Sequence, residues 1–468
     1  MSARRAVRPF APLVIAGLTA LLIVWLPLPF GSVVVWSHLA FQLAAFALLA
    51  LVSVLLADCP LVRRAILPTL ALAAVAALGF AQSASWPADI VRVISPEHAR
   101  LQEQAADLAG GMVRDAPAPT LSLAPDVTRH AALSWAAVAA CLLVASCVAR
   151  GARERRVLLA GVIAAAVFQL LYGTTALATQ SRTIWGVAVP GDPTRLRGTF
   201  VNADHLAYFL EIALTASLAW TWWAIRRTRW ESTHERRVLL VAPPVLLWLT
   251  MFVGLAFTGS RAGLIAVIAA TLGQGAAVAA SERRWRIGAT GLAALVAGLG
   301  AVAAVSLQQG FGRWLATSRW ELTWNDRVMV YARSLDLWTR FPLSGSGLST
   351  FRDAFPLVQP TELTGSYWHA HNDYVELLVT AGVLGAALVL TALVTSLRGM
   401  GRVLQDGQRS EDRAAALAAI GAFIAVAVHS VLDFGLSMPA NAATLAILVG
   451  AALGSPTASD ARAETATG

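Results

Sequence analysis

The stretch WHAHNDYVELL brings two histidines, an asparagine and two carboxylates to the start of a long apolar run. Asp373 and Glu376 have the spacing of a capping box, with Asn372 as an alternative cap, so the start of a helix explains these three residues. Capping does not explain His371 or His369. The positive end of a helix dipole disfavours an imidazolium just before the helix, and a general base must be neutral. His371, directly before the helix, is therefore a candidate general base, and His369 is a further candidate.

Two glycine-flanked arginines are candidates for binding an anion. The stretch FTGSRAGL places Arg261 in a tight turn between apolar runs, with Gly259 and Gly263 on either side. An arginine so close to hydrocarbon needs a partner, and a planar guanidinium binds phosphate oxygens in a bidentate manner. Arg197 precedes Gly198, where a backbone can approach a ligand closely. The alternative is that both side chains reach lipid headgroups at the membrane interface.

Further polar residues open or close other apolar runs. In VNADHLAYFLE, Asn202 or Asp204 caps the helix that begins there, and His205 follows at once. In VHSVLDFGLSMPANA, His429 and Asp433 are four residues apart and share a helix face. This pair either packs helices together or takes part in the same site.

Metal ions and nucleic acids are not expected ligands. The His-x-His pair offers two metal ligands, but no third ligand follows at a suitable spacing, so we predict no metal and no other cofactor. The net charge is +9, yet the arginines fall in short clusters between apolar runs. A nucleic-acid-binding protein needs a basic face on a soluble module instead.

The composition indicates a membrane protein. Of 468 residues, 57% are hydrophobic and 13% are charged, whereas about a quarter are charged in soluble proteins. A spanning helix needs about 20 apolar residues, and about twelve such runs occur. We expect spans at residues 11–30, 34–57, 65–82, 131–149, 157–179, 203–225, 238–257, 262–280, 287–306, 374–397, 414–434 and 438–454. The predicted fold is an all-α polytopic membrane protein with one transmembrane domain over 1–454.

Arginine-rich loops alternate with the other connections, which sets the predicted orientation. The positive-inside rule places these loops, both termini and the short tail 455–468 in the cytoplasm. The largest outer connection is 307–373, between the ninth and tenth spans. Within it, 326–342 has apolar positions at helical spacing and predicts a helix along the outer membrane surface. All the polar stretches described above then lie on the same outer face. Arg327 of this helix is a further candidate site residue on that face.

Five pieces of the chain resemble the O-antigen ligase and polysaccharide polymerase superfamily of bacterial envelope glycosyltransferases. They are RLRGTFVNADHLAYFLEIAL, GSRAGLIA, WNDRVMVYARSLDLWTRFPLSGSGLSTF, HAHNDYVELLVTAGVLG and VHSVLDFGLSMPANA, in this order within about residues 155–450. Asp204 stands where the family often has asparagine. The resemblance implies a lipid-sugar glycosyltransferase-like fold in the inner membrane, with the active site on the periplasmic side.

The resemblance also implies a reaction. A glycan on undecaprenyl diphosphate would pass to a glycan or lipid acceptor hydroxyl without a metal, with inversion at the anomeric carbon. Arg197 and Arg261 would bind the diphosphate, and His371 would activate the acceptor. The supporting residues would be His369, Asn372, Asn202, His205, Arg327, His429 and Asp433. Membrane lipid and other envelope polysaccharide assembly proteins are the expected partners.

Two other functions fit a membrane protein of this kind. A lipid-linked sugar transporter or flippase would carry its ionisable residues near the middle of the membrane, whereas the predicted mid-span regions here are almost free of charge. A protein O-oligosaccharyltransferase would share the donor and differ in its acceptor. The sequence does not separate ligase from polymerase, because both use the same donor.

Overall fold

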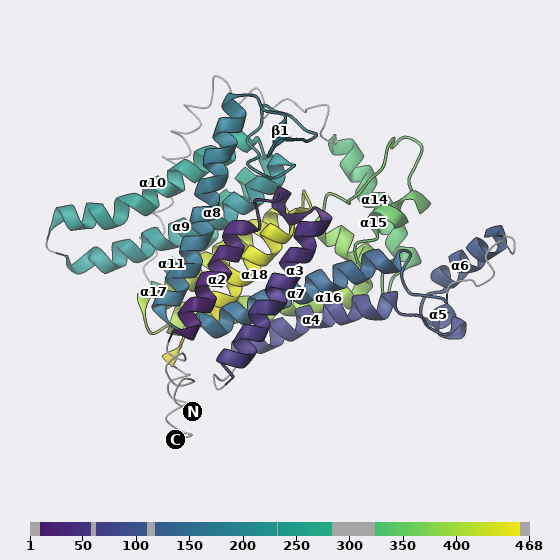
Figure 1. The fold of residues 1–468 in the computed structure, drawn as a ribbon, viewed down its shortest axis with the longest axis horizontal. Coiled ribbons are helices and arrows are strands. Elements are labelled where there is room, and N and C mark those ends of the chain that lie inside the picture. The colour runs from purple at the N-terminus through teal and green to yellow at the C-terminus, as the bar shows by residue number, and fades with distance from the viewer. Residues whose placement is uncertain (1–9, 58–61, 110–117, 232, 283–322, 459–468) are drawn as a thin grey trace.

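The computed structural model describes residues 10–57, 62–109, 118–231, 233–282 and 323–458 (Figure 1). The predicted span 287–306, residues 307–322 of the large outer connection and residues 459–468 of the tail lie outside the described residues. Within the described ranges the fold is helical, with one short antiparallel hairpin of β1 (Thr183–Ile184) and β2 (Val187–Ala188). This confirms the all-α class.

Each predicted span, apart from 287–306, coincides with a helix. These are α2 (Ala11–Trp25), α3 (Val35–Leu55), α4 (Arg63–Ser83), α7 (Pro125–Val148), α8 (Ala152–Ala178), α9 (Ala203–Arg227), α10 (His234–Thr258), α11 (Arg261–Glu282), α16 (Asp373–Asp406), α17 (Ser410–His429) and α18 (Pro439–Leu453). Among the described residues, eight of them are long and apolar enough to cross a membrane, namely α3, α4, α7, α8, α10, α11, α16 and α17. The apolar helices α2 and α18 are shorter.

Helix α9 lies in the interior of the bundle, where it packs against α17, α10 and α11. Nearly every residue of its first half is buried, because most of this stretch is apolar or small and its buried Glu211 pairs with His429 of α17. A second group forms around α7, which packs against α4, α18 and α3. The two groups share one apolar core, so the start of α9 is held from several directions.

Short elements gather beyond one end of the long helices α4, α7 and α16 (Figure 1). They are α5 (Ala88–Ile94), α6 (Pro96–Ala109), α14 (Trp324–Arg340) and α15 (Phe351–Ala354). The other short helices are η1 (Phe30–Ser32) between α2 and α3, η2 (Thr228–Trp230) after α9, η3 (Phe355–Leu357) after α15 and η4 (Gly435–Ser437) before α18. Helix α14 confirms the helix predicted at 326–342, and Thr323 and Asp326 form its capping box. The described part of the outer connection is therefore folded around its own small core.

Helix α16 is broken at Gly382, which corrects the uninterrupted span predicted at 374–397. Gly382 has φ 63° and ψ −169°, a conformation that is essentially confined to glycine. The break is filled by the backbone of residues 342–347. Four backbone hydrogen bonds close it, from Ser346 to Val379, from Gly347 to Thr380, from Val383 to Pro342 and from Leu384 to Leu343. The buried Gln82 of α4 also donates to the carbonyls of Ser344 and Thr380.

Candidate active site

His371 occupies a strained backbone position directly before α16. Its φ is +53°, in the left-handed region that residues other than glycine rarely adopt. The hydroxyl of Tyr331 donates to its carbonyl oxygen over 2.8 Å. The next residue, Asn372, caps α16 by accepting hydrogen bonds from the N–H groups of Tyr374 and Val375. The surrounding structure thus fixes the conformation of His371, and such strain is typical of functional sites.

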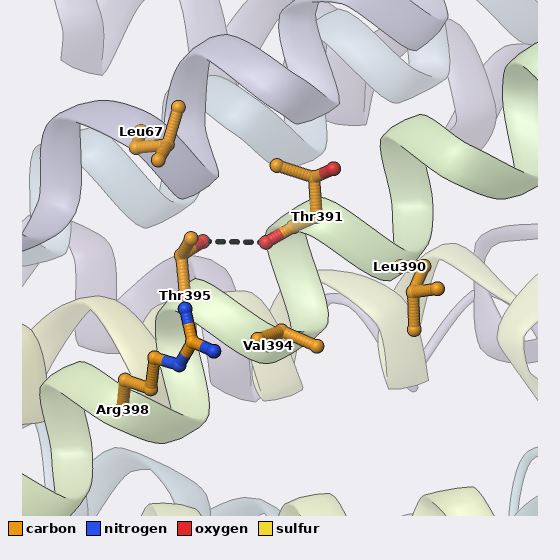
Figure 2. A pocket seen from close by; sticks show the side chains of 6 residues that line it. All are labelled: Leu67, Leu390, Thr391, Val394, Thr395 and Arg398. Carbon is orange, nitrogen blue, oxygen red and sulfur yellow. Dashed lines mark hydrogen bonds between the residues drawn. The ribbon is translucent and has the colours of Figure 1, made fainter.

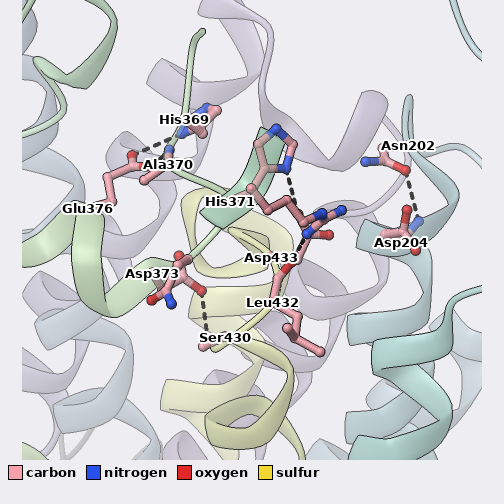
Figure 3. Close-up of polar contacts among 12 residues, drawn as sticks. Asn202, Asp204, His369, Ala370, His371, Asp373, Glu376, Ser430, Leu432 and Asp433 are labelled. Atoms are coloured by element: carbon pink, nitrogen blue, oxygen red, sulfur yellow. Dashed lines mark hydrogen bonds and ion pairs between the residues drawn. The ribbon is translucent and has the colours of Figure 1, made fainter. Parts of the chain in front are cut away.

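The imidazole of His371 faces the carboxylate of Asp433 (Figure 3). Its Nδ1 lies 3.5 Å from Oδ1 of Asp433, which is within ion-pair distance but longer than a hydrogen bond. Burial raises the pKa of Asp433, but His371, His205 and His429 lower it more, and the carboxyl stays well below its ordinary range. An ionised Asp433 favours the proton on Nδ1 of His371, which leaves Nε2 as the basic nitrogen.

His369 belongs to a separate pair with Glu376. Its Nδ1 lies 2.9 Å from Oε1 of Glu376, and the other oxygen of Glu376 accepts a hydrogen bond from the N–H of Ala370 over 3.0 Å. Burial lowers the pKa of His369, but the charge and hydrogen bond of Glu376 outweigh it, so the pKa is raised. Glu376 therefore favours the protonated form of His369.

The predicted capping box of Asp373 and Glu376 is wrong, and the alternative cap Asn372 is the actual one. Asp373 instead accepts hydrogen bonds from the hydroxyls of Ser430 (2.7 Å) and Tyr208 (3.3 Å). Both carboxylates reach residues outside the first turn of α16. They join this turn to the segment before it and to α9 and the end of α17.

Phe434 is the common neighbour of three histidines, and the sequence reading did not single it out. The ring of His369 stacks on it at 4.1 Å between centroids, and His205 and His371 each meet it edge-on at 4.8 Å. His205 is buried at the start of α9. An aromatic residue after a polar stretch is common in membrane proteins, so nothing in the sequence marked Phe434.

Asn202 caps α9 as predicted, by accepting a hydrogen bond from the N–H of Asp204 over 2.9 Å. The side chain of Asp204 forms an ion pair with Arg195 over 2.8 Å. Arg195 also donates to the carbonyl of Thr258 over 2.6 Å. This chain of contacts joins the start of α9 to the turn between α10 and α11.

The predicted pairing of His429 with Asp433 is wrong, because α17 ends at His429 and Asp433 lies beyond the helix. His429 instead pairs with Glu211 of α9 over 2.7 Å, and both side chains are completely buried. Tyr208 stacks on the imidazole at 3.9 Å. The sequence did not predict this pair, because its members are 218 residues apart.

Arg197 is buried and already bound within its own loop. Its guanidinium donates to the carbonyls of Pro190 (3.2 Å) and Ser181 (3.0 Å), and burial lowers its pKa. Gly198 has φ +57°, and a Cβ there would lie 2.3 Å from Oε1 of Gln169. The close approach that this glycine allows is therefore to Gln169.

Arg261 is the exposed first residue of α11. Gly259 ends α10 in a left-handed conformation, with φ 69°, which turns the chain sharply as predicted. A Cβ on Gly263 would lie 2.9 Å from Oε1 of Glu211, so this glycine allows α11 to pack against the buried pair. The start of α11 is thereby fixed beside the start of α9.

Arg327 of α14 donates to the carbonyl of Leu432, the residue before Asp433. This contact holds the segment that carries Asp433 against α14. Within the described ranges, no three His, Cys, Asp or Glu side chains are arranged to hold a metal ion.

A groove of about 350 Å³ lies elsewhere, between α4 and α16 (Figure 2). It is lined by Leu67, Leu390, Thr391, Val394, Thr395 and Arg398. Leu390 comes 17 residues after Asp373, so the groove lies roughly 25 Å along α16 from the histidines. It is a feature of the lipid-exposed length of the helix and is separate from the site.

Residues 245–390 match the family model for O-antigen ligase. The resemblance to this superfamily is confirmed. The matched range contains Arg261, α14 and His371, while Arg197, His429 and Asp433 lie outside it. A search of curated proteins found no match. Its apolar helices make the chain a multi-pass membrane protein, and residues 245–390 resemble a family of membrane enzymes that transfer glycans and whose substrates in general are lipid-linked glycans and their acceptors.

Proposed function

We propose that the protein is a glycosyltransferase that moves a glycan from undecaprenyl diphosphate to an acceptor hydroxyl at the periplasmic face of the bacterial inner membrane. The observation that carries this proposal is the conformation of His371. Its backbone is fixed by Tyr331 and Asn372, and its Nδ1 faces the ionised Asp433. Among the described residues its Nε2 has no hydrogen-bond partner, so this nitrogen can accept a proton from a substrate.

In the proposed reaction the acceptor oxygen attacks the anomeric carbon of the donor glycan. The proton of the hydroxyl passes to Nε2 of His371, and Asp433 stabilises the imidazolium that forms. The bond between the anomeric carbon and the diphosphate oxygen breaks, and the diphosphate leaves with the electron pair. Attack from the side opposite the leaving group inverts the anomeric centre, as the family resemblance implies.

The departing diphosphate needs positive charge close to it. Arg261 is exposed at the N-terminus of α11, where the helix dipole also favours an anion. Arg197 would have to exchange its two carbonyl partners for the diphosphate. We therefore assign Arg261 the main contact with the diphosphate and Arg197 a contact made only when the donor binds.

A transporter is the rival function, and the break in α16 is the feature that favours it. Discontinuous helices in transporters expose free backbone groups that bind the substrate or the coupling ion. Here the backbone groups around Gly382 are hydrogen-bonded to residues 342–347 and to Gln82. Because these hydrogen bonds occupy the backbone groups at the break, the break does not favour binding of an ion or substrate. This supports an enzyme whose site lies at the histidines.

Replacing His371 with alanine tests the proposed base. The purified protein, reconstituted in liposomes with its lipid-diphosphate-linked glycan and acceptor, should lose about 10²- to 10⁴-fold in kcat, the usual contribution of a general base. The matched control is His130→Ala, which removes an exposed histidine from α7. Normal transfer by His371→Ala at equal membrane expression would rule out His371 as the base.

Replacing Arg261 with lysine tests the diphosphate contact. Lysine keeps the charge but loses bidentate binding, so we expect a higher KM for the donor together with a lower kcat. Full activity of Arg261→Lys would assign this arginine to lipid headgroups instead.

The glycans of a deletion strain would separate the acceptors. Single repeats without long chains would indicate a polymerase, whereas unattached full-length chains would indicate a ligase. Unglycosylated target proteins would indicate a protein O-oligosaccharyltransferase.

A further inference from the structure

An exposed tryptophan lies beside the histidines and rests on an arginine. The side chain of Trp368 is 60% exposed, although it belongs to the segment that leads into the site. The guanidinium carbon of Arg352 lies 3.9 Å from the centre of its ring, which is a close cation–π contact. Arg352 is itself exposed, and among the described residues it has no hydrogen-bond or ion-pair partner. Arg352 thus covers one face of the indole ring, and the rest of the ring is largely open to solvent.

Both members of this pair are attached to rigid structure. Arg352 lies on α15 next to the buried Phe351, whose ring stacks on that of the buried Phe355 at 5.1 Å between centroids. Tyr367, next to Trp368, packs against Phe355 with ring centroids 5.5 Å apart. A ring held in this way loses little side-chain entropy when a ligand binds.

The pair lies within reach of the proposed base. Trp368 is three residues before His371, so their Cα atoms are at most about 11 Å apart. His369, which lies between them in the sequence, is fixed by Glu376 and Phe434. A ligand on the indole is therefore separated from His371 by a distance that a short oligosaccharide covers.

We propose that Trp368 and Arg352 form a subsite for a sugar ring. The open face of the indole would stack on the C–H face of the ring, and the N–H groups of Arg352 would donate to its hydroxyl or carboxylate oxygens. The assignment of this sugar to the transferred glycan or its acceptor rests on the proposed function. A tryptophan that only anchors the protein at the membrane interface would need neither the arginine nor this position beside the site.

The test compares Trp368→Ala and Trp368→Phe with the control Trp36→Ala. Trp36 is also 60% exposed, but it contacts the ring of Trp25 and lies at the start of α3. The probe is the oligosaccharide released by mild acid from the lipid-linked glycan, and its binding to the full chain in nanodiscs is followed by saturation-transfer NMR. The KM for donor and for acceptor is measured separately in the liposome assay.

We expect Trp368→Ala to weaken binding of the oligosaccharide and to raise one of the two KM values about tenfold, which corresponds to about 1.4 kcal/mol. The value of kcat should change little. Trp368→Phe should keep most of the affinity because it retains an aromatic face, and Arg352→Met should give a smaller loss. Trp36→Ala should behave as the wild type.

Equal binding and equal KM values for Trp368→Ala and Trp36→Ala would overturn the subsite. The same conclusion follows if Trp368→Phe is as defective as Trp368→Ala, since the loss would then not depend on an aromatic face. A wild-type protein that binds the oligosaccharide through Trp368 but transfers nothing would contradict the proposed function and leave the subsite standing.

Discussion

At the scale of single residues, the proposed mechanism makes His371 depend on Asp433. The two side chains are 3.5 Å apart, so a small movement on substrate binding would bring them into hydrogen bonding. We expect Asp433→Asn to lower kcat by about 10²-fold or more, because the amide no longer stabilises the imidazolium or selects its tautomer. KM should change little. A pH–rate profile and kcat for Asp433→Asn identical to the wild type would mean that Asp433 serves only the fold.

His369 gives the site a pH-dependent stability. Its pKa is raised in the folded protein by Glu376, so its contribution is fully present below the ordinary histidine pKa of about 6.5. This contribution is lost as the pH rises through the higher folded value. Thermal unfolding in detergent should therefore show the wild type losing stability above about pH 6.5 more steeply than Glu376→Gln. Parallel curves for the two proteins would contradict this role.

The sequence identified the histidines as candidate site residues, but it did not predict which side chains from other segments they contact. His371, His369 and Asn372 stand in one short motif, so their local roles could be read from helix capping and the helix dipole. Other segments of the chain supply the partners Glu211, Asp433 and Phe434. Only the packing of α9 and α17 decides which histidine each of these side chains contacts. The i, i+4 rule failed for His429 because the helix ends there.

At the scale of elements, the break in α16 depends on two backbones in contact. A Cβ on Gly382 would lie 2.3 Å from the carbonyl oxygen of Leu343, and the residue also has a positive φ. We expect Gly382→Ala to destabilise the protein by about 3 kcal/mol or more, since strain and a steric clash add. The matched control is Gly401→Ala on the same helix, where a Cβ meets nothing within 4 Å.

Gly401→Ala should be neutral or stabilising by about 0.5–1 kcal/mol, because alanine favours a helix more than glycine does. The measurement is thermal or denaturant unfolding in detergent. Similar stabilities for the two variants would show that the break is not needed. Hydropathy could not predict this feature, because residues 374–397 are apolar on both sides of the glycine and their partner, residues 342–347, comes from the outer connection.

At the scale of the whole molecule, composition and hydropathy were sufficient to predict the class of fold. Apolar runs of spanning length must form helices in a membrane, since no other local structure satisfies the backbone there. The predicted runs therefore coincide with helices where the structure describes them, except that α16 is broken at Gly382. The folded outer region was harder to predict, because its core unites short segments from α14 to η3 with the start of α16.

The orientation of the bundle remains a prediction that α16 makes testable. After its break at Gly382, α16 continues to Asp406 and would be roughly 36 Å long over this part, more than the roughly 30 Å of a bilayer core, so its two ends should lie on opposite sides. In a Cys59→Ser background, Glu362→Cys before α16 and Gln405→Cys near its end each add one exposed thiol, and Cys141 and Cys147 are buried. A membrane-impermeant maleimide applied to cells with a permeabilised outer membrane should label Glu362→Cys. It should label Gln405→Cys only after the inner membrane is opened. The reverse pattern would place the histidines in the cytoplasm, where a periplasmic glycan donor could not reach them.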